Sequence, residues 1–281
     1  MRLHEMSVSQ IVKLITDEDR AVHEAMTRAA PSITRLIEAA EPGFCAGGRL
    51  IYLGAGTSGR LGVLDASEAP PTFMVPPDRV IGLIAGGDAA LRKSSEGAED
   101  DPNGAHPEID ALKLTKLDTL IGIAAGGTTP FVLGGLEHAS ATGCIRALIV
   151  CSPIEKPPFI DHLIVLDTGP EVLTGSTRMK AGTATKLALN TLSTTLMIRS
   201  GCVYENLMVD LRATNNKLRD RAARILSTLT GLTRDQSFTL LDRAGGAVKT
   251  ATVMHRLNLT REEADLILHQ NSGRLHDAIK N

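Results

Sequence analysis

The stretch from Arg49 to Glu68 constrains the fold of this 281-residue chain more than any other. An apolar run of strand length, Leu50–Leu53, breaks into the glycine loop Gly54-Ala-Gly-Thr-Ser-Gly59. A buried strand that ends in such a loop and leads into a helix is typical of an anion-binding turn, because glycines let the backbone approach a phosphate. Further on, Pro70-Pro71 is predicted to stop the helix and leave the Glu68 carboxylate near the mouth of the same crevice.

Five short apolar runs recur along the chain, with helix-forming or turn-rich segments between them: 50–53, 80–85, 119–124, 146–150 and 163–166. Their continuous hydrophobicity indicates strands covered on both faces, as in the parallel sheet of an α/β protein. The first three runs each end in a glycine loop, at 54–59, 86–87 and 126–129. Ligands bind at the carboxyl ends of parallel strands, so the three loops predict one composite site.

The flanking segments are predicted to be helical. Residues 1–43 carry apolar residues at helical spacing in two successive runs. Ser7 is the predicted cap of the first run, and Pro31 is predicted to interrupt the second. A long helix is also expected to run to Arg199, with Ser176 and Thr177 at the N-cap position. Arg178 and Lys180 would lie in its first turn, where cations are unfavourable without an anion, so this segment predicts part of an anion site.

The last third of the chain predicts a small helical domain. One helix is expected over 204–229, followed by three short ones, two of them capped by Thr233 and Thr260. The predicted domains are therefore residues 1–215, which bind the ligand, and residues 216–281.

Composition excludes several classes of partner. Thirty Lys and Arg against 32 Asp and Glu leave the chain nearly neutral, so nothing favours nucleic acid or a membrane surface. The four cysteines and eight histidines show no metal-ligand spacing, and no apolar run reaches 18 residues. These features predict a reduced, cytoplasmic protein without a metal, whose partners are small molecules or proteins.

The candidate chemistry leaves alternatives open. The loop 54–59 matches the pattern GxGxxG, but the next strand arrives late and ends in two glycines instead of an acid, which disfavours a dinucleotide. Glu68 is either catalytic or a plain helix-end carboxylate, and Glu99 lies in an acidic cluster that by itself predicts a solvated turn. Two carboxylates at one site, however, can supply an acid and a base.

Five long motifs, in order along the chain, resemble one family closely. They are residues 50–68, 82–87, 96–100, 175–183 and 205–210, and they resemble the N-acetylmuramic acid 6-phosphate etherases of the sugar isomerase (SIS) superfamily. The resemblance implies an α/β fold, a five-stranded parallel-sheet SIS sandwich with a small C-terminal helical domain. It also implies a cytoplasmic, homodimeric lyase that acts on a sugar phosphate of bacterial cell-wall recycling and needs no cofactor.

The resemblance implies roles for individual residues. Glu68 corresponds to the proton donor of the family and Glu99 to the residue that removes a proton. Two departures from the family matter. In the second glycine loop, Gly126 stands where the family has a phosphate-binding serine and Thr128 where it has arginine, and the segment ahead of the first helix is shorter than is usual in the family. The predicted substrate-binding set is Gly56, Thr57, Ser58, Arg60, Gly126, Gly127, Thr128, Thr129, Ser176, Thr177 and Lys180.

Two other functions remain as alternatives. One is a non-catalytic sugar-phosphate sensor like the glucokinase regulatory protein, whose first loop is similar. The other is an aldose–ketose isomerase, which would also abstract the proton at C2.

Overall fold

The structure, a computed structural model, describes residues 2–93, 96–211 and 216–280. It divides into two compact units, which are considered separately below. The first comprises Met1–Glu68 and Pro77–Leu196, and the second comprises Ala69–Pro76 and Met197–Asn281. No helix among the described residues is long and apolar enough to cross a membrane.

A five-stranded parallel sheet forms the centre of the first unit. Its strands lie in the order β2-β1-β3-β4-β5, with every neighbouring pair parallel. Their bounds are β1 Leu50–Gly54, β2 Val80–Ile84, β3 Thr119–Ile123, β4 Ile145–Val150 and β5 His162–Val165. The five strands predicted from apolar runs are confirmed, and β1 and β3 are buried along their whole length, as continuous hydrophobicity indicates.

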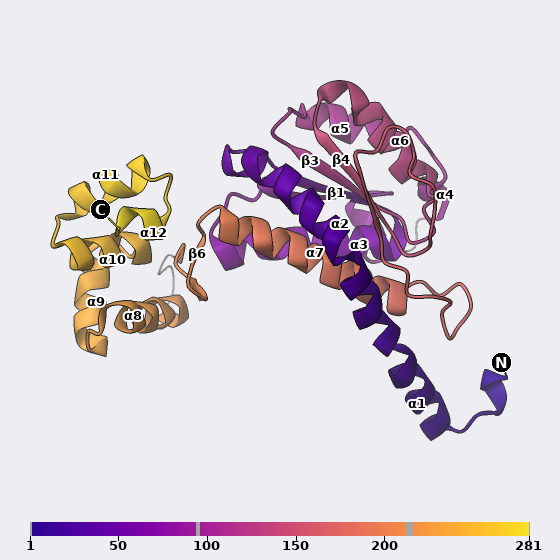
Figure 1. The fold of residues 1–281 in the computed structure, drawn as a ribbon, viewed down its shortest axis with the longest axis horizontal. Coiled ribbons are helices and arrows are strands. Elements are labelled where there is room, and N and C mark those ends of the chain that lie inside the picture. Colours follow the sequence, from indigo (N-terminus) through magenta and orange to yellow (C-terminus); the bar gives the residue numbers. More distant parts are fainter. Residues whose placement is uncertain (1, 94–95, 212–215, 281) are drawn as a thin grey trace. The chain divides into compact units, whose positions relative to one another are not determined.

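Helices cover both faces of this sheet (Figure 1). α5 (His106–Leu112) and α6 (Pro130–His138) pack on the face that carries Ile51 and Leu53. α2 (Arg20–Cys45), α3 (Gly56–Phe73) and α7 (Lys180–Arg199) lie on the opposite face. α3 lies very close to the sheet at Gly62. A Cβ added to this glycine would lie only 2.8 Å from the Tyr52 Cβ. Glycine is therefore required for this packing.

The N-terminal segment begins with the short helix Leu3–Glu5 and α1 (Val8–Glu18). The predicted cap is confirmed: the Ser7 hydroxyl accepts from the Gln10 amide, and the Gln10 side chain accepts from the Ser7 amide. α2 then continues through Pro31, so the predicted interruption there is wrong. Buried side chains on both sides of the proline, Ala29 and Ile33, hold the helix against the sheet.

The predicted stop at Pro70-Pro71 is also wrong. α3 runs on to Phe73, and its last turn is closed by the hydrogen bond from the Met74 amide to the Pro70 carbonyl, at 2.9 Å. Phe73 is buried, which adds packing free energy that offsets the two amide donors lost at the prolines. Glu68 therefore lies inside the helix and not at its end.

The second unit is mainly helical. α8 (Asn216–Thr230), α9 (Arg234–Arg243), α10 (Val248–Leu257), α11 (Arg261–Gln270) and α12 (Leu275–Ala278) enclose their own apolar core. The caps at Thr233 and Thr260 are confirmed, each in a reciprocal capping box.

The helix predicted over 204–229 is wrong in its first part. β6 (Val203–Tyr204) and β7 (Leu207–Met208) pair in an antiparallel hairpin. Its two-residue loop places Glu205 at φ +53°, a conformation that such tight hairpin loops demand and a helix does not allow. The helix begins only at Asn216, and residues 212–215 of the predicted helix lie outside the described residues.

Candidate functional site

The first glycine loop joins β1 to α3, as its sequence predicts. Gly56 has φ +53°, a conformation that favours glycine, and the half-buried Thr57 and Ser58 follow it in the first turn of α3. The Arg60 guanidinium donates to the carbonyl oxygens of Leu91 and Lys93, at 3.2 and 3.4 Å. Arg60 thus ties this loop to the segment that follows β2.

The second loop joins β3 to α6. Gly127 has φ +75° and is buried, and Thr129 is the N-cap of α6 without a side-chain cap hydrogen bond. A Cβ on Gly126 would meet only the Thr128 hydroxyl, at 3.8 Å. The loop therefore has room for a side chain at position 126, where the resemblance implies a serine.

The third motif differs from its predicted arrangement. α7 begins at Lys180, so Ser176 and Thr177 lie ahead of the helix and are not its N-cap. The Glu171 carboxylate accepts hydrogen bonds from the Lys180 and Ala181 amides, at 3.1 and 3.0 Å. The anion expected at this helix N-terminus is thus a side chain of the protein itself.

Lys180 is the most buried cation of the predicted set, with 3% of its side chain exposed. Its Nζ lies 2.6 Å from Glu18 Oε2, at the end of α1. A buried ammonium needs such a partner, because an unpaired charge is costly to remove from water. A substrate phosphate could engage Lys180 only by replacing or joining this carboxylate.

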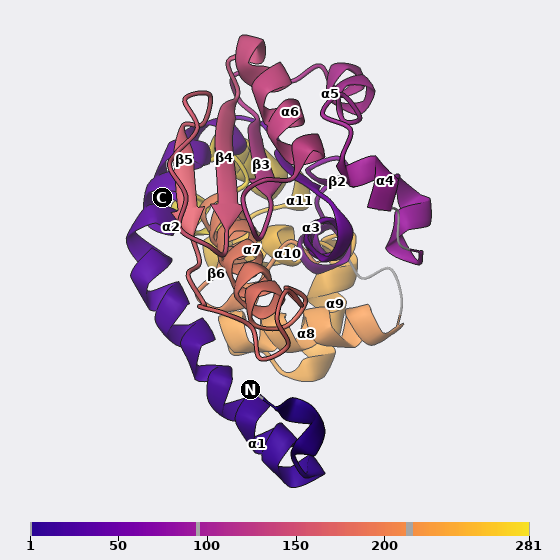
Figure 2. The same ribbon diagram turned by 90° about the vertical axis from the view of Figure 1, so that its right-hand side faces the viewer.

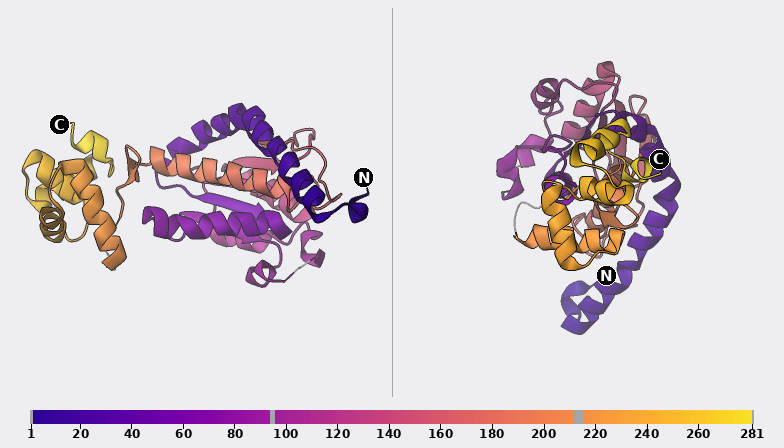
Figure 3. Two further views of the ribbon diagram at one scale, coloured as in Figure 1. Left: turned by 90° about the horizontal axis from the view of Figure 1, so that it is seen from below. Right: turned by 90° about the vertical axis from the view of Figure 1, so that its left-hand side faces the viewer.

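Figure 3 shows α3 and α7 running alongside each other. Residues of both helices line two hollows. The first hollow, of about 300 Å³, brings Thr57 of the first loop together with Arg178 of the third motif. The second, of about 230 Å³, contains Glu68. Leu61 and Lys186 line both hollows, so the two hollows adjoin, and together they are called the groove below.

A buried hydrogen-bond network supports the wall of the second hollow. Asp65 accepts from the Tyr52 hydroxyl at 2.7 Å, from Asn190 Nδ2 at 2.6 Å and from the Ser193 hydroxyl at 3.2 Å. Burial and the adjacent carboxylate together raise the pKa of Tyr52 well above its usual value. Tyr52 therefore stays a neutral donor, and the network fixes α3 and α7 to β1.

The structure does not bring Glu68 to the phosphate loops of its own chain. Eleven residues separate Thr57 from Glu68 along α3, which corresponds to about 16 Å of helix rise. Glu99 ends α4 (Glu96–Glu99), which packs against α6, the helix that begins at the second loop. Within one chain, Glu99 thus lies on a helix that packs beside α6, and Glu68 lies at the end of the groove away from Thr57.

Lys186 and Asn190 of the groove were not predicted, and Arg178 was predicted as part of an anion site but not placed in the substrate-binding set. Arg178 and Lys186 are exposed, and neither makes an ion pair in the described part of the chain. Four-residue spacing places Lys186 and Asn190 on one face of α7, but only the position of α3 shows that this face lines the groove.

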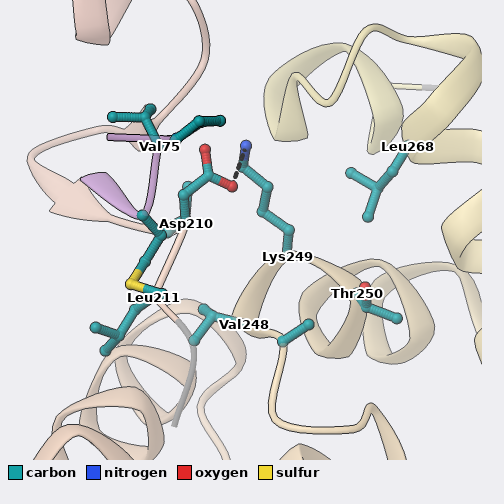
Figure 4. A pocket seen from close by; sticks show the side chains of 11 residues that line it. Val75, Asp210, Leu211, Val248, Lys249, Thr250 and Leu268 are labelled. Atoms are coloured by element: carbon teal, nitrogen blue, oxygen red, sulfur yellow. Dashed lines mark ion pairs between the residues drawn. The ribbon is translucent and has the colours of Figure 1, made fainter. Parts of the chain in front are cut away.

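The second unit contains a larger cavity of its own, about 470 Å³, shown in Figure 4. Val75, Leu211, Val248 and Leu268 supply apolar walls. Its two charged residues neutralise each other, because Lys249 Nζ lies 2.6 Å from Asp210 Oδ1. This cavity therefore offers no free cation for a phosphate, and the candidate site is the groove of the first unit.

Comparison with known proteins identifies the class first. A phosphoheptose isomerase from Francisella tularensis has a similar structure, with a TM-score of 0.52, 18% identity, and coverage of 69% of this chain and 99% of that chain. A family model described as the glucokinase regulatory protein N-terminal SIS domain matches residues 29–140. The first unit is thus an α/β SIS domain, which confirms the predicted fold class.

Curated relatives then identify the family. A protein from Serratia proteamaculans (strain 568) is 50% identical over 281 residues, 99% of this chain and 94% of the relative. A protein from Synechococcus sp. (strain CC9605) is 49% identical over 278 residues, 99% of this chain and 88% of the relative. Both are named N-acetylmuramic acid 6-phosphate etherase, and this chain belongs to that family.

Proposed function

We propose that this protein is a carbon–oxygen lyase that cleaves the D-lactyl ether of N-acetylmuramic acid 6-phosphate. The products are N-acetylglucosamine 6-phosphate and D-lactate, as in the recycling of cell-wall amino sugars. The observation that carries the proposal is identity of about half the residues, over nearly the whole chain, to proteins named for this activity. The sensor and isomerase alternatives are not favoured, since neither name occurs among these full-length relatives.

The proposed mechanism assigns one proton transfer to each glutamate. Opening the pyranose to its aldehyde makes the C2 proton acidic, and Glu99 removes it. Protonated Glu68 donates to the ether oxygen at C3 as the bond to D-lactate breaks. Water then adds at C3 of the unsaturated aldehyde. Amide donors of the glycine loops would stabilise the negative charge that develops on the C1 oxygen.

The phosphate serves as a handle at the other end of the sugar. Thr57 and Ser58 at the N-terminus of α3, the amides at Gly126 and Gly127, and the hydroxyls of Thr128 and Thr129 supply donors for it. Arg178 lines the hollow that contains Thr57 and supplies a cation. Binding energy from this remote group positions C2 and C3 for the chemistry.

We further propose that the enzyme is a cytoplasmic homodimer. α1 projects beyond the sheet and buries none of its residues, and Val8 on it is 79% exposed (Figure 2). Leu64 of α3 and Leu187 of α7 are 48% and 38% exposed beside the groove. Exposed leucines on the two neighbouring helices α3 and α7 support an interface on this face of the first unit. Sedimentation should give about twice the chain mass of 29.8 kDa.

The dimer also accounts for the position of Glu68. Thr57 and Glu68 are roughly 16 Å apart along the axis of α3. A hexose phosphate is too short to place its phosphate at Thr57 and its C3 ether at Glu68 of the same chain. If the α3 helices of two copies pack antiparallel about a two-fold axis near Leu64, Glu68 of one copy approaches the first loop of the other. Each active site would then combine Glu99 and the loops of one chain with Glu68 of its partner.

We also propose that the chain has the two domains predicted from its sequence, residues 1–215 and residues 216–281. The first would carry all the residues assigned to the reaction. The second would have no part in proton transfer.

Replacing Gly126 by serine is expected to strengthen phosphate binding. The position has open space for a Cβ, and a hydroxyl there would add one donor to the loop. One hydrogen bond to a charged group predicts a decrease in KM of about tenfold, with little change in kcat. Steady-state kinetics on Gly126→Ser checks this.

The matched control is Gly127→Ser, which adds the same hydroxyl at a position that cannot accept it. Gly127 has φ +75°, and its Cβ would lie 2.9 Å from the Ile154 Cδ1. This variant should lose stability and affinity. A Gly126→Ser enzyme with an unchanged or higher KM would contradict the placement of the phosphate at this loop.

The direct test of the function is incubation with N-acetylmuramic acid 6-phosphate and an assay for D-lactate. The etherase releases one D-lactate for each substrate consumed. A sensor would bind the sugar phosphate without turnover, and an isomerase would convert aldose to ketose phosphate without releasing lactate. Failure to release D-lactate from this substrate would refute the proposed function.

A further inference from the structure

We infer that Lys186 binds the lactyl carboxylate of the substrate and thereby selects the muramic acid derivative over sugar phosphates that lack the lactyl group. This inference rests on the proposed function, because it concerns the group that the reaction removes. It assigns the hollow of about 230 Å³ around Glu68 as the lactyl subsite.

The reaction itself places the carboxylate near Glu68. In the substrate, the lactyl carboxylate is separated from the ether oxygen by a single carbon atom. A residue that donates a proton to that oxygen must therefore lie within a few ångströms of the carboxylate. An anion that leaves water to enter this hollow needs a cation beside it, because an unpaired charge is costly to bury.

Lys186 is the cation that this hollow provides within the described chain. It lines the hollow together with Glu68, its side chain is exposed, and no described residue pairs with it. Other cations of the groove region are differently placed. Lys180 is held by Glu18, and Arg178 lines only the hollow of Thr57, whereas Lys186 lines both hollows.

Apolar walls of the hollow suit the methyl group of a lactyl substituent, and Asp65, the other acid of the lining, is already engaged by three donors. Leu61, Leu64 and Leu189 supply the apolar surface for the methyl group. The volume is below the roughly 300 Å³ at which pockets for whole small-molecule ligands begin, so it suits a substituent and not a complete sugar. Asn190 is fixed by its hydrogen bond to Asp65 at 2.6 Å, which keeps this wall rigid.

The assignment does not depend on which copy of the chain binds the phosphate. Lys186 and Glu68 line one hollow of one chain. In whichever active site Glu68 donates its proton to the ether oxygen, Lys186 of the same chain lies in the same hollow.

The test compares two substrates on matched variants of the full-length enzyme. The substrates are N-acetylmuramic acid 6-phosphate and its analogue in which the lactyl carboxylate is a primary carboxamide. The readout is kcat/KM for release of D-lactate or D-lactamide. Lys186→Met should lower kcat/KM for the acid about 10- to 100-fold and leave the amide within about threefold, because only the acid loses a charge-assisted contact.

Three further variants make the comparison specific. Lys186→Arg keeps the charge and should retain the preference for the acid. Lys186→Gln repeats the test if the methionine variant does not fold. Lys116→Met removes another exposed lysine, close to the amino end of β3. It should leave kcat/KM unchanged for both substrates.

Equal losses on acid and amide, or no loss on either, would overturn the assignment of Lys186. A wild-type enzyme that released neither D-lactate nor D-lactamide would instead refute the proposed function. The two failures are therefore distinguishable.

Discussion

Glutamine in place of Glu68 or Glu99 is expected to lower D-lactate release by about 100- to 10 000-fold in either variant, the usual contribution of a positioned general acid or base. Both proteins should fold as the wild type does. Glu68 is exposed and makes no hydrogen bond to another described residue, and Glu99 is half-buried on a four-residue helix. Glutamine also preserves the size of either side chain while it removes the ability to exchange a proton.

The two variants should fail at different steps. In heavy water, Glu68→Gln retains the base and should exchange the C2 proton of the substrate for deuterium without releasing lactate. Glu99→Gln should show neither exchange nor lactate release. Nuclear magnetic resonance of the recovered sugar phosphate distinguishes these outcomes. Glu137→Gln, an exposed residue of α6 outside the groove, is the control. Near-normal lactate release from either active-site variant would contradict its assigned role.

Replacing Asp118 by alanine is expected to destabilise the first unit by about 3–5 kcal/mol, the cost of breaking a buried ion pair from one side. Asp118 is 2% exposed and accepts from the Arg49 amide at 2.8 Å, from two Arg49 guanidinium nitrogens at 3.0 and 2.9 Å, and from the Thr115 amide at 2.8 Å. Alanine leaves these donors without an acceptor. The midpoint of urea unfolding should fall accordingly.

Asp161 provides the matched control for this prediction. It pairs with Arg146 at the start of β4 as Asp118 pairs with Arg49 at the start of β1, but its side chain is 41% exposed. Asp161→Ala should therefore cost about 1 kcal/mol or less. Equal losses in the two variants would contradict the view that burial makes the Asp118 hydrogen bonds important.

The effect of Asp118 should also depend on pH. Burial alone would raise its pKa, but the hydrogen bonds from Arg49 and the Thr115 amide outweigh burial and lower the pKa below the usual 3.8. A depressed pKa in the folded state contributes stability above the unfolded pKa and loses it as pH falls through the folded value. The difference between wild type and Asp118→Ala should thus be full at neutral pH and shrink as the pH falls below 3.8 and through the lowered pKa of the folded state.

Sequence alone predicted those features that local interactions decide. All five strands were found from apolar runs, because burial on both faces leaves a continuous apolar segment. The capped helices at Ser7, Thr233 and Thr260 were found because a capping box is complete within four residues.

Features that depend on distant residues could not be predicted in this way. Packing of Phe73 keeps α3 helical beyond two prolines, although the local rule predicts a stop. Glu171 occupies the N-terminal amides of α7 from nine residues away, and Glu18 reaches Lys180 across 162 residues. The spacing of these residues gives no sign of either contact.

The candidate site shows the same limit. The three loops were correctly expected at the carboxyl ends of the strands, because parallel topology requires it. The distance between Glu68 and the first loop depends on how far α3 extends, and the role of Lys186 depends on α7 packing beside α3. Both become evident only in three dimensions.

The most direct test of a shared active site is complementation between two inactive variants. In the proposed homodimer, Glu68→Gln and Glu99→Gln chains that are co-expressed, or unfolded and refolded together, would form hybrid dimers in half of the assemblies. If each site takes Glu68 from one chain and Glu99 from the other, every hybrid contains one intact site, and the mixture should recover about a quarter of the wild-type rate of D-lactate release. A mixture as inactive as its two components would contradict the shared site.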